Sequence, residues 1–245
     1  MHKSNLKLKD TQLSFFLGSF RSVADYIFKN IGNSLVVLPT SLHDFASVWD
    51  ESSLGKIYNQ IDICTTDGMP LVWSFRFFGK KSTERVYGPD LMAYLLEKSD
   101  SNMSHYFLGA NPIIEQKLQQ YLGLNFPLLN TTSSSFLEKD SAEIKNEKIV
   151  LNKIKEVAPN LLWIGIGSPK QVELAVKWKK DLPQTTIICV GAAFDLITHS
   201  KPTAPVLVKK IGLEWLFRLI LEPKRLGKRY LVRIPLFIIK YIFYR

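Results

Sequence analysis

An aspartate and an arginine, eighteen residues apart, are the side chains of this sequence best suited to proton transfer and anion binding. Asp67 follows a β-prone apolar run that ends near Cys64, and Gly68 beside it allows a sharp turn. Arg85 lies beyond the next helical pattern, so the carboxylate and the guanidinium could meet over one cavity. The alternative is that Asp67 only caps the helix that opens near Pro70.

Five short apolar or β-branched runs alternate with amphipathic helical patterns along the chain. The predicted strands are Ser34 to Leu38, Ile61 to Thr65, His105 to Gly109, Leu161 to Gly167 and Thr186 to Ala192. The predicted helices are Asp90 to Lys98, Ile113 to Leu122, Ile144 to Val157 and Lys170 to Lys180. This order predicts an α/β fold with a largely parallel sheet covered on both faces. The polar segment Asn130 to Ser135 is predicted to be a loop.

Three predicted strands end in turns of small residues before a helix, which is where free backbone amides can bind phosphate oxygens. The candidate binding residues in these turns are Gly109, Asn111, Gly167, Ser168, Gln171 and Asp195. The chain has no GxGxxG fingerprint and no P-loop. Three such turns at one edge of one sheet still favour a nucleotide-type site.

Composition narrows the class of protein. A chain of 245 residues with 46% hydrophobic residues is long and apolar enough for a proper core. The first ten residues lack the apolar run of a signal peptide. Cys64 and Cys189 fall in predicted buried strands, which favours reduced core thiols, and the four histidines have no metal-ligand spacing. We therefore expect neither a metal nor a cofactor.

The charge of the chain is concentrated at its C-terminal end. The net charge of the chain is +10. Residues 201–245 hold eleven Lys or Arg and two acids, whereas the numbers of basic and acidic residues are nearly equal in residues 1–200. Aliphatic and aromatic residues are interleaved with these cations in runs too short to span a bilayer. The pattern predicts a segment in the membrane interface, with Arg229, Arg233, Lys240 and Arg245 towards anionic headgroups. A core helix with snorkelling lysines is the alternative, and the many aliphatic residues argue against a nucleic-acid arm.

Six sequence blocks occur in the order and spacing of a known family. They read TTDGMPLVW, ERVYGPDL, FLGANP, WIGIGSPKQ, VGAAFDL and GLEWLFRLILEPKRLGKRY. From about Val36 to Tyr230 the chain thus resembles the WecG/TagA/CpsF glycosyltransferases (family 26). The resemblance implies a Rossmann-like core, here residues 1–211, and a C-terminal membrane-associating helical appendage, residues 212–245. It also implies inverting, metal-independent transfer of a sugar from a nucleotide diphosphate sugar to a polyprenyl-diphosphate-linked saccharide.

The resemblance assigns roles to individual residues. Asp67 matches the family's catalytic base, Arg85 a cavity arginine and Gln171 a cavity glutamine. The appendage residues Arg218, Arg225 and Lys228 match positions that close over the site. The chain departs from the family pattern at Leu38, Thr40 and Val172, where relatives have threonine, asparagine and an acid; Thr40 is kept as a candidate substrate-binding residue.

The expected protein is therefore a peripheral enzyme at the cytoplasmic face of a bacterial plasma membrane. Its expected partners are a UDP-sugar donor, a polyprenyl-diphosphate-linked acceptor and an anionic membrane surface, with no nucleic acid; the sequence is compatible with a homo-oligomer. The donor sugar is left open between N-acetylmannosamine, its uronate and another hexose. A non-catalytic membrane-associated protein, or a nucleic-acid-binding protein using the basic tail, is the alternative.

Overall fold

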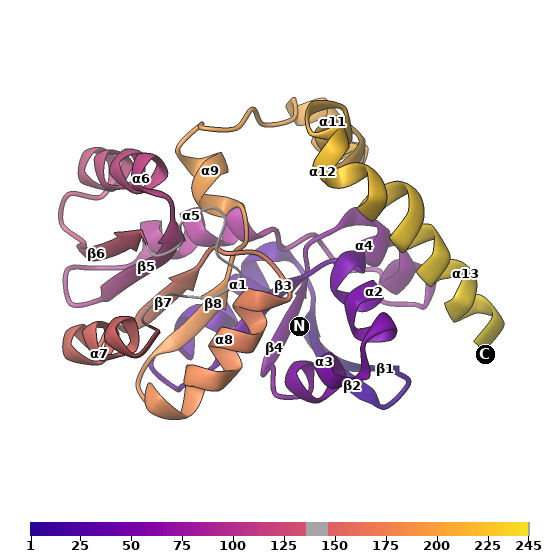
Figure 1. The fold of residues 1–245 in the computed structure, drawn as a ribbon, viewed down its shortest axis with the longest axis horizontal. Helices are drawn as coiled ribbons and strands as arrows, with labels where there is room; N and C mark the ends of the chain where they lie inside the picture. Colours follow the sequence, from indigo (N-terminus) through magenta and orange to yellow (C-terminus); the bar gives the residue numbers. More distant parts are fainter. Residues whose placement is uncertain (136–146, 245) are drawn as a thin grey trace.

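The computed structural model describes residues 1–135 and 147–244, and these residues form a mostly parallel sheet with helices on both faces (Figure 1). The strand order in this part of the chain is β1-β2-β4-β3-β8-β7-β5-β6, with only the β1–β2 pair antiparallel. The strands are β1 (His2–Leu8), β2 (Thr11–Leu17), β3 (Val36–Thr40), β4 (Ile63–Thr66), β5 (Ser104–Ala110), β6 (Asn130–Ser135), β7 (Leu161–Ile164) and β8 (Thr186–Cys189). The predicted fold class is confirmed.

The sheet separates two hydrophobic cores, because successive side chains of a strand point to opposite faces. Val37 and Leu38 of β3 are both fully buried, yet they belong to different core clusters. One core includes residues of α1 (Phe20–Lys29), α5 (Gly88–Lys98), α6 (Pro112–Asn125) and α9 (Ala193–Ile197). The other includes residues of α2 (Leu42–Asp50), α3 (Ser52–Tyr58), α4 (Met69–Phe77), α7 (Glu147–Val157) and α8 (Lys170–Trp178). Cys64 and Cys189 are buried in it as free thiols, as expected.

The predicted strands and helices are all present, but two features at the edges of the sheet differ from the prediction. The prediction of a loop at Asn130–Ser135 is wrong, because this segment is β6 and pairs in parallel with β5. An edge strand can be polar, since its main chain makes the ladder and its side chains need not be buried. The N-terminal hairpin of β1 and β2 was not predicted either. Residues 144–146 of the predicted helix Ile144 to Val157 lie outside the described residues.

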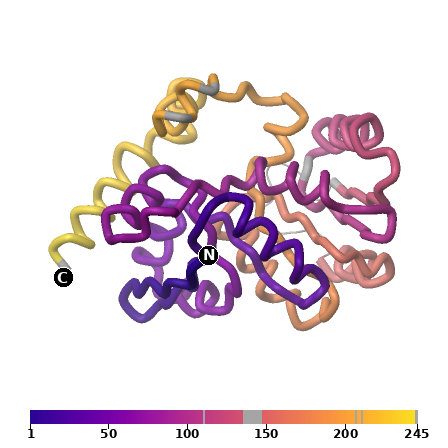
Figure 2. The backbone as a smooth tube through the Cα atoms, turned by 180° about the vertical axis from the view of Figure 1, so that it is seen from behind, coloured from indigo at the N-terminus to yellow at the C-terminus, as the bar shows by residue number. Residues whose placement is uncertain are grey.

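The C-terminal region is a chain of short helices that ends against the core. It comprises α10 (Val206–Lys210), α11 (Glu214–Leu221), α12 (Pro223–Gly227), a π-helical segment (Lys228–Arg233) and α13 (Ile234–Tyr244). Phe237 of α13 is 5% exposed and lies in the core cluster, with its ring 5.7 Å from Trp49 and 6.3 Å from Phe45 of α2. Figure 2 shows this region from the opposite side, where it runs along one end of the molecule. Among the described residues, no helix is long and apolar enough to cross a bilayer.

The order of the strands also positions the site. β3 and β8 are neighbours in the sheet although nearly 150 residues separate them, and the helices that follow them, α2 and α9, lie on opposite faces of the sheet. In such sheets the carboxyl ends of the strands diverge beside the switch point and leave a crevice for ligands. The residues after β3, β4, β7 and β8 therefore lie around one space.

Candidate active site

A cavity of about 610 Å³ lies at the carboxyl ends of these four strands. Its floor includes Asp67, which follows β4, and the glycine-rich turns after β7 and β8. Its roof comes from the C-terminal region, through Glu214, Arg218 and Arg229 among others. The space is thus shared between the sheet and the segment that the sequence predicts to be an appendage.

Asp67 is not the cap of the helix that follows it. The N-cap of α4 is Gly68, and no side chain bonds to the free amides there. The backbone N–H of Asp67 donates to the Thr40 carbonyl at 3.0 Å, which ties the turn after β4 to the end of β3. The carboxylate is thereby left free to face the cavity and its charged neighbours.

Arg85 is held against the end of β4 by its own backbone. The N–H of Val86 donates to the carbonyl of Thr66 at 2.8 Å, and the hydroxyl of Thr66 donates to the carbonyl of Glu84 at 2.7 Å. These bonds fix the residue between them, and its guanidinium also donates to the main-chain carbonyl of Asp67. The Nη2 atom of Arg85 lies 3.7 Å from the Oδ1 atom of Asp67. The carboxylate of Asp67 and the guanidinium of Arg85, at the two ends of α4, therefore meet over the cavity.

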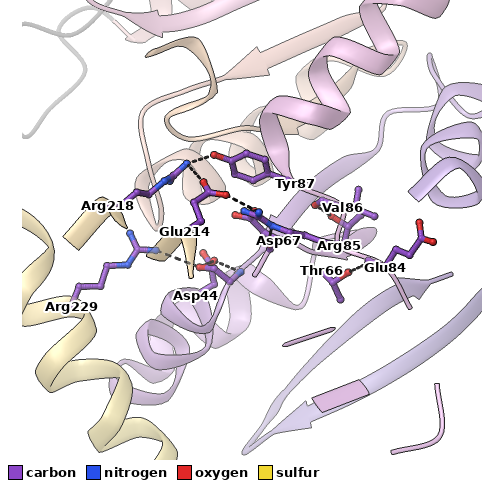
Figure 3. Close-up of polar contacts among 12 residues, drawn as sticks. Asp44, Thr66, Asp67, Glu84, Arg85, Val86, Tyr87, Glu214, Arg218 and Arg229 are labelled. Carbon is purple, nitrogen blue, oxygen red and sulfur yellow. Dashed lines mark hydrogen bonds and ion pairs between the residues drawn. The ribbon is translucent and has the colours of Figure 1, made fainter. Parts of the chain in front are cut away.

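Glu214 of α11 joins two arginines across the cavity roof. Its Oε2 accepts a hydrogen bond from Arg85 at 2.8 Å, and its Oε1 forms an ion pair with the Nη2 atom of Arg218, also at 2.8 Å. Arg218 in turn donates to the hydroxyl of Tyr87, whose ring lies 4.0 Å beneath the Arg85 guanidinium. Figure 3 shows these side chains converging beside Asp67. The C-terminal region is thus linked to the core through a half-buried ionic cluster around the buried Glu214.

The electrostatics of this cluster differ for its two acids. Burial raises the pKa of Asp67 to about 6, against the opposing effect of Arg85 and Arg218, although 29% of its side chain is exposed. Burial also acts to raise the pKa of Glu214, but its two arginines outweigh burial and hold that pKa below the usual range. At neutral pH, Glu214 is therefore a fixed anion and Asp67 a carboxylate with elevated proton affinity.

Gln171, at the start of α8, braces two of the glycine turns. Its amide oxygen accepts from the N–H of Gly167 at 3.2 Å and from the N–H of Gly191 at 3.0 Å. Its amide nitrogen donates to the hydroxyl of Ser168 at 3.2 Å. Both glycines have positive φ, 85° and 57°, which side chains with a Cβ rarely adopt. Gln171 therefore shapes the floor of the cavity, and its amide is already engaged by the protein.

A second cluster of polar side chains lies in the cavity wall at the start of α2. The guanidinium of Arg229 donates to the hydroxyl of Ser41 at 3.5 Å, and Ser41 in turn donates to Asp44. Burial and the nearby Arg229 lower the pKa of His43 to about 4, so its imidazole is neutral at pH 7. The Nδ1 atom of His43 and the Nε atom of Arg229 are buried without a hydrogen-bond partner. Buried polar atoms are usually paired, so these two nitrogens are exceptions beside the cavity.

Several expected binding residues do not face the cavity. The hydroxyl of Thr40 is buried and donates to the carbonyl of Leu38 at 2.9 Å, so the sheet uses it. Asn111 caps α6 by accepting from the N–H of Ile114, and neither Asn111 nor Gly109 is among the residues that line the cavity. Lys228 is exposed outside the cavity. These four residues are therefore not among those that line the cavity. For Gly109 and Asn111 the reason is the strand order, which puts the end of β5 three strands away from β3.

Other expected residues do line the cavity. They are Arg85, Gly167, Ser168, Gln171, Asp195, Arg218 and Arg225. Asp195 lies 3.6 Å from Lys201, and Arg225 is paired with Glu222 at the cavity rim. No group of three or more His, Cys, Asp or Glu side chains gathers to hold a metal ion within residues 1–135 and 147–244.

The cations predicted to face a membrane are divided by the structure. Arg229 lies in the cavity wall instead of on the outer surface, because the π-helical segment turns it towards α2. Arg233 donates to Asp50 of α2 at 2.9 Å, which fastens the segment to the core. Lys240 is exposed, and Arg245 lies outside the described residues.

Sequence reasoning missed Glu214, Tyr87, His43 and Arg229 as cavity residues. Glu214 carried one signal, because it is one of only two acids in the basic C-terminal region. His43 was considered only as a metal ligand, and its place after β3 was the signal available. Tyr87 lies two residues from Arg85, within the same motif.

Comparison with known proteins agrees with this architecture. The chain is 25% identical over 170 residues to an N-acetylglucosaminyldiphosphoundecaprenol N-acetyl-beta-D-mannosaminyltransferase of Bacillus spizizenii, which covers 69% of this chain and 64% of that protein. It is 26% identical over 186 residues to a protein of the same name from Staphylococcus aureus, covering 76% of this chain and 70% of that protein. The chain thus matches less than two thirds of the Bacillus protein. The sequence model of the glycosyl transferase WecG/TagA/CpsF family matches residues 11–245, so the chain belongs to this family of glycosyltransferases.

Proposed function

We propose that this protein transfers an N-acetylmannosaminyl group from a UDP-sugar to N-acetylglucosaminyldiphosphoundecaprenol, with inversion at the anomeric carbon. The transferred sugar and the acceptor are those in the names of the two relatives. The UDP donor and the inversion follow from the family resemblance. The uronate of N-acetylmannosamine, or another hexose, is the alternative donor sugar.

The observation that carries the proposal is the carboxylate of Asp67 in the cavity, with a pKa of about 6. A base with this pKa is deprotonated at pH 7 and accepts a proton more readily than an ordinary aspartate. Asp67 accepts the proton of the acceptor hydroxyl as the hydroxyl oxygen attacks C1 of the donor sugar. The bond from C1 to the diphosphate oxygen breaks in the same step, and UDP leaves with the electron pair.

The leaving diphosphate needs positive charge, and Arg85, Arg218 and Arg225 supply it from the core and the roof of the cavity. Guanidinium groups bind phosphate oxygens bidentately, and a preorganised cation stabilises the charge that develops on the leaving group. Glu214 keeps the first two arginines in place before substrate arrives. The diphosphate then takes over part of their hydrogen bonding.

The acceptor defines the place of the reaction. An undecaprenyl chain stays in the bilayer, so its diphosphate-linked saccharide is presented at the membrane surface, where the cavity must meet it. The concentration of positive charge after residue 200 supports binding to anionic lipid. We propose the cytoplasmic face of the plasma membrane as this surface.

The test is transfer from a panel of UDP-sugars to a GlcNAc-diphosphoprenyl acceptor by wild type and two Asp→Asn variants. Asp67→Asn should reduce turnover by at least ~10²-fold while UDP-sugar binding survives, as expected for a lost general base. Asp181→Asn is the matched control, because this exposed carboxylate pairs only with Lys155 among the contacts described. Near-wild-type turnover of Asp67→Asn, or no transfer from any UDP-sugar by wild type, would refute the proposal.

A further inference from the structure

Helix α4 carries one apolar stripe from the cavity to the surface of the molecule. Met69, Trp73 and Phe77 are spaced four residues apart and so lie along one side of the helix. Met69 and Trp73 line the cavity, and Trp73 is already 47% exposed. At about 1.5 Å per residue, Phe77 lies ~12 Å further along the helix from Met69. An apolar path therefore leads outward from beside Asp67.

The outer end of α4 is unusually apolar for a surface. Phe77 is 85% exposed and Phe78 is 66% exposed, with their ring centroids 5.3 Å apart. We call Phe77 and Phe78 with the neighbouring Lys80 and Lys81 the aromatic tip. From residue 73 to residue 82 the chain has three cations and no acid. Adjacent aromatic rings flanked by cations suit the interface of an anionic bilayer, where rings enter the headgroup layer and lysines meet phosphates.

The apolar surface of α4 continues into the C-terminal region. Gly212 packs so closely on α4 that an added Cβ would lie 2.7 Å from the ring of Trp73 and 3.0 Å from Met69. Ile211 and Leu213 on either side of it are 52% and 37% exposed. Figures 1 and 2 both show α4 on the same side of the molecule as α11, α12 and α13. The aromatic tip thus extends the basic, apolar C-terminal surface onto the core.

We propose that the aromatic tip is a membrane-binding site of the core itself, which inserts into the interface of an anionic bilayer and turns the mouth of the cavity towards lipid. The site does not depend on the C-terminal helices for its contact with lipid. It rests on the proposed function only in that a lipid-linked acceptor gives the contact its purpose. With Met69 and Trp73 between the tip and Asp67, the acceptor's prenyl chain can stay in apolar surroundings while its saccharide reaches the base.

The experiment measures co-sedimentation of the full-length protein with phosphatidylcholine vesicles, with and without phosphatidylglycerol, in the absence of substrate. Phe77→Ser/Phe78→Ser should reduce the partition coefficient by ~10-fold or more on both vesicle types, since each exposed ring loses its burial in lipid. Lys80→Gln/Lys81→Gln should weaken binding only to the anionic vesicles, and more at low salt. The control Leu124→Ser/Leu128→Ser removes two side chains that are 83% and 81% exposed on the β6 side of the sheet, and should bind as wild type does.

Unchanged vesicle binding by the double phenylalanine variant would overturn the proposal, as would an equal loss in the leucine control. A concentration-dependent dimer in sedimentation that the phenylalanine variant abolishes would also overturn it, because the tip would then bind a second copy of the chain. Circular dichroism and thermal melts show whether each variant is folded. Since the assay contains no substrate, its result is independent of whether the proposed transfer reaction occurs.

Discussion

Asp67 lies among charges that act on its pKa in opposite directions. Burial and the neighbouring Glu214 raise this pKa, whereas Arg85 and Arg218 lower it, and the result is a value of about 6. The same arginines are the proposed ligands of the diphosphate. The proton affinity of the base is therefore linked to the cations that bind the leaving group.

This linkage predicts the pH dependence of the reaction. The base acts only when deprotonated, so kcat/KM should rise tenfold per pH unit below about 6 and level off above it. A profile of kcat/KM against pH, measured from pH 4.5 to 8 with a saturating concentration of an acceptor whose lipid chain is uncharged, would reveal this acidic limb. Asp181→Asn should retain the limb. A wild-type profile that is flat through pH 6 would contradict the assignment of Asp67 as the base.

Two substitutions around Asp67 should shift the limb in opposite directions. Glu214→Gln removes a negative charge that raises the pKa of Asp67, so the limb should move to lower pH. Arg85→Gln removes a positive charge that lowers it, so the limb should move to higher pH. Both variants should also raise the KM for the UDP-sugar, because each disrupts the cluster that holds the guanidinium groups. Shifts of the same sign in the two variants would show that the cluster does not control the base.

At this scale, the sequence predicted the residues that depend on local order. Asp67 and Arg85 follow from a strand end and a neighbouring motif, and they meet as their spacing suggested. Glu214 could not be assigned, because its contact with Arg85 spans 129 residues and depends on how α11 folds back over the sheet. His43 and Arg229 meet only through the docking of the C-terminal region on α2.

At the scale of elements, the prediction succeeded wherever burial imposes a pattern. The central parallel strands are continuous apolar runs because both of their faces are covered, and such runs are readable in a single sequence. β6 was missed because its Thr and Ser residues lie at the edge of the sheet, where the strand does not need apolar side chains on both faces. The path of the C-terminal helices was also not readable, since an apolar helix packs equally well on a core or in lipid.

The docking of α13 offers a test of how this element supports the site. Phe237→Ala removes a buried ring from between Trp49 and Phe45, a change that costs ~3–5 kcal/mol in protein cores. We expect faster amide exchange across residues 214–244 and lower turnover, because Arg218 lies on the same chain of helices. Hydrogen-exchange mass spectrometry would locate the change. Ile239→Ala, an exposed position of the same helix, is the control, and equal effects of the two variants would argue against docking through Phe237.

At the scale of the whole molecule, the positive charges of the C-terminal region are divided between the cavity and the outer surface. Arg218 and Arg229 line the cavity, Arg225 lies at its rim, and Arg233 is paired with Asp50. The exposed cations of the region include Lys224, Lys228 and Lys240. A count of net charge cannot separate these groups, because only the fold decides which side chains face the substrate and which face solvent.

This division predicts that substitutions of the outer lysines change vesicle binding, whereas substitutions of the cavity arginines change the kinetics of transfer. Lys224→Gln/Lys228→Gln/Lys240→Gln should weaken binding to anionic vesicles, most at low salt, since a cation near such a surface contributes about 1 kcal/mol. The triple variant should keep the wild-type kcat and KM on a short-chain acceptor in solution.

The matched substitution within the cavity should behave in the reverse way. Arg229→Gln leaves the outer lysines untouched, so its vesicle binding should equal that of wild type. It removes a guanidinium that lines the cavity and contacts Ser41, so KM should rise for one of the two diphosphate substrates. Isothermal titration with UDP then shows which substrate Arg229 contacts. Weaker UDP binding would assign Arg229 to the donor site, and unchanged UDP binding would assign it to the acceptor site. If the lysine variant lost activity in solution, or if Arg229→Gln lost vesicle binding, surface and cavity charges would not be separate in function.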